Sequence, residues 1–162
     1  MTDKFSIPIP ELTLTENPPV GFYFMVVFFI SEIRPNPLDI RFQKVSGISA
    51  EIETTDIREG GENIFRHRLP NHVTYNNLVL ERGMVTSSPL KDEFNTAMNS
   101  MQFAPSNVLV MLLNENTDPV SSWLFERAYP VKWTLSDLDA NANAVVIDTM
   151  ELAYARFKSV KI

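Results

Sequence analysis

The chain has 162 residues, of which 44% are hydrophobic and 21% charged, and its formal net charge at pH 7 is −6. This length suffices for one domain with a sizeable core, and the apolar content excludes an intrinsically disordered chain. An acidic chain lacks the basic surface that binds phosphates, so we expect no specific nucleic-acid binding. Because the chain contains no cysteine, a disulfide scaffold, a thiolate zinc site and a cysteine nucleophile are excluded.

A long apolar run extends from Val20 to Ile30. It has about half of the ~20 residues that a helix needs to cross a bilayer. The residues before it are more acidic than basic, and no small-residue cleavage site follows it, unlike a signal peptide. We therefore expect production in the cytoplasm without membrane insertion.

Residues 1–19 are predicted to form an irregular N-terminal arm, because prolines remove backbone donors there. Residues 20–162 are predicted to form one domain. Its first strand, 22–30, is rich in Phe and Val and apolar on both faces. We expect such a strand to be buried centrally or covered by a neighbouring subunit. The candidates for an apolar contact between subunits are Phe22, Phe24, Val26 and Phe28.

Residues 41–58 alternate between polar and apolar side chains, with a break at Ser46-Gly47. The alternation predicts a half-buried strand with Ile52 on its buried face and carboxylates on its outer face. A glycine-containing turn follows at 59–63. Further strands are predicted at 64–69 and 73–82, which Pro70-Asn71 separates, and at 107–113, 120–133 and 144–156.

One helix is predicted at about 88–102. Ser88 can cap its first turn, and Pro89 occupies the position where a missing N–H costs nothing. Leu90, Phe94 and Ala97 recur at helical spacing, and the helix ends before Pro105. The expected fold is mostly β, an antiparallel β-sandwich or barrel-like domain with this one α-helix.

No set of residues predicts a catalytic, cofactor-binding or metal site. His67 and His72 lie on either side of a proline, and Arg66 and Arg68 beside His67 repel a cation, which favours a polar surface strand. Residues 137–148 have the first acids of a calcium loop but lack its glycine and its final glutamate, which favours an Asx-rich turn.

Trp123, Tyr129 and Trp133 suggest an alternative function, that of a carbohydrate-binding β-sandwich module. They share one face if 120–133 is a strand without a bulge, and an exposed aromatic platform stacks on sugars. Packing of the same residues into the core is the competing interpretation, because large aromatic residues on one strand face usually build the core.

Short motifs follow one another over residues 22–157. They are Val45–Ile48, Ile57–Asn63, Leu69-Pro70, Tyr75–Leu78 leading to Gly83, Leu112–Glu115, Trp123-x-Phe125, Ala128–Trp133, Asp137–Ala140 and Glu151–Ala153. In this order they resemble the tail tube protein family of contractile phages and phage tail-like injection particles. The chain departs from the family pattern at Asn71, where glycine is usual, and at Asp139, where asparagine is common.

The resemblance implies a structural subunit of an inner tube and not an enzyme, with no cofactor. Homohexameric rings with a continuous inner β-barrel stack into a hollow tube within a contractile sheath. The implied partners are other copies of the chain, adjacent rings, baseplate hub or spike proteins, and sheath subunits. We expect a like-charged lumen wall with Glu51, Glu53 and Thr55. Candidates for ring-to-ring contacts are the N-terminal arm and Arg58, Glu59, Gly60, Gly61, Glu62 and Asn63.

Three segments bear on the layer of the tube. Residues 18–24, the insertion at Pro35-Asn36-Pro37 and the turn at 58–63 resemble the variants that initiate the tube on the baseplate hub. The alternative is the repeating main tube protein. We expect the initiator layer of a phage tail or related particle.

Overall fold

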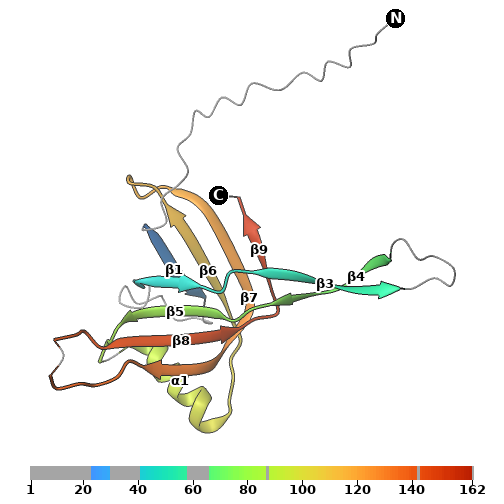
Figure 1. Ribbon diagram of the computed structural model, residues 1–162. Helices are drawn as coiled ribbons and strands as arrows, with labels where there is room; N and C mark the ends of the chain where they lie inside the picture. The colour runs from blue at the N-terminus through green and yellow to red at the C-terminus, as the bar shows by residue number, and fades with distance from the viewer. Residues whose placement is uncertain (1–22, 30–40, 58–65, 87, 142, 162) are drawn as a thin grey trace, which may run out of the picture.

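The computed structural model describes residues 23–29, 41–57, 66–86, 88–141 and 143–161 (Figure 1). These ranges hold nine strands and one helix. The elements are β1 (Phe24–Phe29), β2 (Lys44–Ser46), β3 (Ala50–Ile57), β4 (His67–Tyr75), β5 (Leu78–Gly83), α1 (Pro89–Ser100), β6 (Ser106–Leu113), β7 (Pro119–Leu135), β8 (Ile147–Ala153) and β9 (Arg156–Val160).

Two antiparallel sheets share the long strand β7. Sheet A contains β1, β6, the first half of β7 and β9, whereas sheet B contains β2, β5, β8 and the second half of β7. The strand passes from one sheet to the other near Arg127, whose φ is 56°, and a register shift follows between Pro130 and Lys132. Such irregularities bend a strand, so β7 forms a corner of the fold.

The core lies between the two sheets and under α1. Alternate residues of each strand point into it, because successive side chains of a strand point to opposite faces. Sheet A contributes Val26, Phe28, Val108, Val110 and Phe125; sheet B contributes Leu78, Leu80, Met150 and Leu152; the helix contributes Leu90, Phe94 and Ala97. Burial of each large apolar side chain contributes roughly 1.5–3 kcal/mol.

Local sequence signals set both ends of α1. The hydroxyl of Ser88 accepts a hydrogen bond from the backbone N–H of Lys91 at 3.3 Å, and Pro89 begins the helix. Met101 ends it with a left-handed backbone, φ 53°. Within the described part of the chain, no helix has both the length and the apolar character that crossing a membrane requires.

The structure confirms the predicted fold class, which is mostly antiparallel β with one helix. Three predicted strands differ from the structure. The predicted strand 73–82 is the end of β4 followed by β5, with Asn76-Asn77 between them. Pro70 lies inside β4, because a bulge between Ile52 and Thr54 accommodates it in a two-stranded ribbon. The predicted strand 144–156 is instead two strands, β8 and β9, separated by Tyr154-Ala155.

The prediction that β3 is half-buried is also wrong. Strands β3 and β4 pair only with each other, and every residue of β3 is exposed. Figure 1 shows this hairpin projecting beyond the two sheets. The alternation of its residues is real, but no second layer of the chain covers its apolar side.

Candidate assembly surfaces

The first strand was expected to be buried centrally or covered by a neighbouring subunit. Central burial holds for Val26 and Phe28, which are 0% and 6% exposed because β6 and the core of the same chain cover them. The reason for assigning these two side chains to a subunit contact therefore no longer holds. Phe24 is partly exposed at the end of the strand, and Phe22 lies outside the described residues.

The hairpin β3–β4 is joined to the domain by aromatic packing at its base. Tyr75, the last residue of β4, lies with its ring 5.7 Å from each of Tyr154 and Phe157. Both partners pack against the core, and Tyr154 contacts buried Phe125 edge to face at 4.9 Å. Tyr75 therefore lies on the inner side of the ribbon, the side that faces the interior of the sandwich.

The direction of the Tyr75 side chain defines the inner and outer sides of the hairpin. Ala50 is its register partner and Ile52 is the partner of Val73, so these residues share the inner side. Glu51, Glu53 and Thr55 alternate with them and therefore point to the outer side. Glu53 there lies 3.3 Å from His72, carboxylate oxygen to Nε2. The lumen-facing candidates thus share one side of a projecting ribbon.

The outer face of sheet B is the face that points away from the core. Its charged residues form two ion pairs, Lys44 with Glu81 at 2.7 Å and Lys132 with Glu151 at 2.9 Å. Hydrogen bonds from Lys132 and Asn77 hold the pKa of Glu151 below its ordinary value. The other outward side chains include Ser46, Val79, Thr134 and Thr149, together with Tyr129, which is 38% exposed.

The predicted ring-to-ring candidates, Arg58 to Asn63, lie outside the described residues. In sequence they lie between β3 and β4. The N-terminal arm, residues 1–19, also lies outside the described part of the chain. Both assignments stay predictions.

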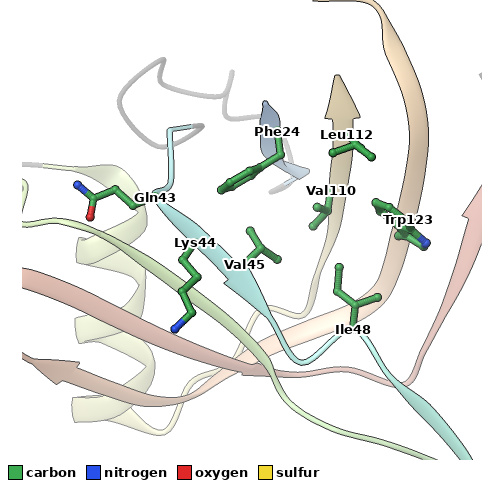
Figure 2. Close-up of a pocket in the computed structure, with 8 residues that line it drawn as sticks. All are labelled: Phe24, Gln43, Lys44, Val45, Ile48, Val110, Leu112 and Trp123. Atoms are coloured by element: carbon green, nitrogen blue, oxygen red, sulfur yellow. The ribbon is translucent and has the colours of Figure 1, made fainter. Parts of the chain in front are cut away.

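A groove opens where sheet A extends past β2 (Figure 2). Phe24, Val110, Leu112 and Trp123 form its wall on sheet A, and Gln43, Lys44, Val45 and Ile48 form the opposite wall. Its volume is about 220 Å³. The sheet A residues lie on the same side as buried Val26 and Phe125, so the groove is an uncovered continuation of the core.

Sequence reasoning did not find this groove. Its residues come from four separate segments of the chain, and most of them are apolar strand residues with nothing in their local sequence to set them apart. The inward residues of β1 and β6 are apolar, but this pattern does not show whether another layer of the chain covers them.

The described residues give no support to a metal site. Among the described residues, no three His, Asp or Glu side chains gather closely enough to hold a metal ion. The Asp139 carboxylate accepts a hydrogen bond from the backbone N–H of Asn141 at 2.9 Å, as predicted for an Asx turn.

The three aromatic residues do not form one platform, because the bulge in β7 places them on different faces. Trp133 pairs in register with buried Met150, whereas Tyr129 pairs with outward Ala153. Trp123 lines the groove, and Tyr129 packs on Phe103 with ring centroids 5.8 Å apart. The condition for the carbohydrate-binding alternative is therefore not met.

Comparisons with known proteins agree on one family. The family model described as T4-like virus tail tube protein gp19 matches residues 20–158. A chain in the structure of the anti-feeding prophage baseplate, determined with 6-fold symmetry, is 41% identical over 90% of this chain and 97% of its own, with a TM-score of 0.83. No protein of curated function matches.

Two more distant structures have the same fold. A chain of an extracellular contractile injection system, in its sheath–tube complex in the extended state, is 22% identical over 91% of this chain and 95% of its own. A chain of the anti-feeding prophage cap that terminates the tube is 20% identical over 91% and 93%. Each of these two chains has a TM-score of 0.76.

Proposed function

This chain belongs to the T4-like virus tail tube protein family, and we propose that it is a structural subunit of the tube and baseplate region of a contractile injection system. The observation that carries the proposal is the family match over residues 20–158 together with 41% identity to a chain of a contractile baseplate. Copies of the chain assemble into hexameric rings around a hollow lumen, as a non-enzymatic component of the particle.

The finer proposal is that this chain forms the initiator layer of the tube, next to the baseplate hub. Its support is the difference between 41% identity to a chain from a baseplate structure and 22% to a chain from a sheath–tube complex. In this position its partners are other copies of the chain, the next tube ring, hub or spike proteins, and sheath subunits.

We further propose that the outer face of sheet B lines the lumen, and that Glu51, Glu53 and Thr55 extend this wall along the hairpin. The support is that β2 leads into β3 and β4 into β5 along the chain, so the hairpin adjoins sheet B. On sheet B the Lys44–Glu81 and Lys132–Glu151 pairs balance the charge. A wall with balanced charges gives a passing cargo few unpaired charges to bind.

Negative-stain microscopy of the purified chain at high concentration tests the assembly role. Rings or short tubes with 6-fold symmetry are expected. A protein that stays monomeric at high concentration, and that also fails to enter particles purified from producing cells, would contradict the proposal.

The layer requires a test on whole particles. A C-terminal affinity tag on this chain, labelled with gold, is expected to mark one end of each particle, the end that carries the baseplate. Gold along the whole length would identify the repeating main tube protein instead. Staining of particles from an untagged strain is the control for unspecific gold.

A further inference from the structure

A cleft opens between α1 and β7. Glu93 and Ala97 of the helix, Phe103 and Ala104 of the segment after it, and Pro130 of β7 line its walls. Its volume is about 340 Å³, several times the ~30 Å³ share of one water molecule. The cleft therefore has room for a whole side chain of another molecule, and Glu93 is the charged residue of its lining.

The carboxylate of Glu93 is half-buried, and within the described part of the chain no hydrogen bond or ion pair engages it. By contrast, Asp148 is paired with Arg82, and Glu151 with Lys132. Burial raises the pKa of the Glu93 carboxyl group above its ordinary value. Loss of hydration without a partner disfavours the charged form, and a cation in the cleft reverses this effect.

Aromatic and flexible apolar side chains lie at the same end of the helix. The ring of Phe103 is 41% exposed and contacts Tyr129 edge to face, with centroids 5.8 Å apart. Met98 and Met101 are also exposed, and methionine adapts its shape to a partner. A guanidinium group pairs with a carboxylate and stacks on an aromatic face, so Glu93 and Phe103 together suit an arginine.

The end of α1 favours a cation as well. Its last turn contains no basic residue. The carbonyl groups of that turn form the negative end of the helix dipole, which attracts a positive charge nearby. The methylene groups of an arginine cover apolar surface while its head stays with a charged partner. One arginine side chain therefore fits both the apolar walls and the carboxylate.

The chain itself is a poor source of this cation. Its net charge is −6, and most basic side chains of the described residues are held by partners within the chain. These pairs are Lys44–Glu81, Arg66–Asp56, Arg68–Asp56, Arg82–Asp148, Lys132–Glu151, Arg156–Glu126 and Lys158–Glu126. Charge complementarity thus favours a different, basic protein as the occupant of the cleft.

We propose that the cleft binds an arginine side chain of a partner protein other than a second copy of this chain. The guanidinium lies at the Glu93 carboxylate and on the Phe103 ring, and the methylene groups lie along Ala97 and Pro130. The choice of a partner within the particle rests on the proposed function and deepens it, because it gives the chemistry of a contact with a different subunit.

Titration of the full-length chain with Nα-acetyl-arginine amide tests the site, followed by the NMR shifts of the backbone amides. Saturable shifts are expected at Thr96, Ala97 and residues 102–104. Nα-acetyl-citrulline amide has nearly the same shape without the charge and is expected to cause none. Glu93→Gln is expected to weaken binding at least about ten-fold, the usual effect of losing a hydrogen bond to a charged group.

Asp92→Asn is the matched control, because Asp92 is the exposed carboxylate next to Glu93 on the same helix. This variant is expected to bind the arginine amide as the parent does. Thermal unfolding shows that both variants are folded. Equal weakening by the two substitutions, or shifts spread over all acidic surfaces, would overturn the site because they indicate unspecific attraction of a cation.

A photo-crosslinking amino acid in place of exposed Thr96 tests the partner in whole particles. The expected product joins this chain to a different particle protein, at a peptide that contains arginine, and its yield falls when Glu93→Gln is added. A product with a second copy only, or a yield that Glu93→Gln leaves unchanged, would overturn the inference.

The result is separable from that of the proposed function. Glu93→Gln is expected to leave rings intact by negative-stain microscopy, because the cleft is assigned to a different protein. Loss of rings in this variant would overturn the assignment, since the cleft would then join copies of the chain. A parent chain that binds the arginine amide but never assembles would overturn the proposed function and leave the arginine site standing.

Discussion

Arg82 of β5 and Asp148 of β8 are register partners on the inner side of sheet B, and their Nε and Oδ2 atoms lie 3.7 Å apart. Their side chains are 2% and 1% exposed. The indole N–H of Trp133 donates a hydrogen bond to the other carboxylate oxygen of Asp148. Arg82 also donates to the hydroxyl of Ser88 at 3.1 Å, so the ion pair connects sheet B to the start of α1.

Removing the carboxylate is expected to destabilise the fold strongly. Asp148→Ala leaves the charge of Arg82 in the interior without the group that balances it, a change that costs about 3–5 kcal/mol in buried pairs. Urea unfolding measures the loss. The double variant Arg82→Met/Asp148→Leu is expected to recover most of it, because neither charge is then buried. A single variant as stable as the parent would show that water reaches this pair.

Gly47, between β2 and β3, is expected to tolerate no side chain. Its φ is +85°, and a Cβ there would lie 1.9 Å from the backbone oxygen of Asn77. Gly47→Ala is therefore expected to lower the free energy of unfolding by about 1–3 kcal/mol, the usual cost of local backbone strain. The matched control is Gly83→Ala, where the nearest atom lies at 3.8 Å. Equal losses for the two variants, measured by urea unfolding, would contradict this account.

The sequence predicted the features that neighbouring residues determine. Ser88-Pro89 located the start of α1, and the break at Ser46-Gly47 separated β2 from β3. It failed where the outcome depends on distant segments. The alternation around Ile52 correctly indicates a two-sided strand, but whether a second layer covers the apolar side depends on where sheet A ends. Pro70 was interpreted as a break because a bulge in a free ribbon cannot be recognised from one strand alone.

The candidate surfaces were predictable to a smaller extent. Glu51, Glu53 and Thr55 alternate along β3 as the sequence pattern predicts, and their exposure to a lumen stays a prediction. The charge-balanced face of sheet B was not predicted, because Lys44 meets Glu81 and Lys132 meets Glu151 only through strand pairing. The Arg82–Asp148 pair was missed for the same reason. The two residues are 66 positions apart in the sequence, and only the pairing of β5 with β8 brings them together.

Acid is expected to weaken the attachment of β9 to β7. Hydrogen bonds from Arg156 and Lys158, each at 2.5 Å, hold the pKa of Glu126 below its ordinary value. A carboxyl group whose pKa is lower in the folded state contributes stability above its unfolded pKa, about 4.5 here, and loses it as the pH falls through the folded pKa. The contribution is small because the group is accessible to solvent and salt screens it.

The comparison is between thermal unfolding at pH 7 and at pH 3 to 4, values on either side of the ordinary carboxyl pKa of about 4.5. Glu126→Gln is expected to lower the midpoint at pH 7 and to leave it nearly unchanged at the acidic pH. Glu115→Gln, in the exposed turn between β6 and β7, is the control. If both variants respond to pH in the same way, the Glu126 pairs contribute nothing specific.

Trp133 is expected to act through its N–H group and not through an exposed ring. Trp133→Phe keeps most of the apolar ring but removes the donor to Asp148, and a hydrogen bond to a charged group contributes about 1.5–3 kcal/mol. Combined with Asp148→Ala, the loss is expected to be smaller than the sum of the two single losses, because both changes remove the same bond. Urea unfolding of the four proteins in this cycle measures the coupling. Strictly additive losses would mean that the indole N–H and the carboxylate do not interact in solution. Trp133 would then have no established hydrogen-bonding role in the fold.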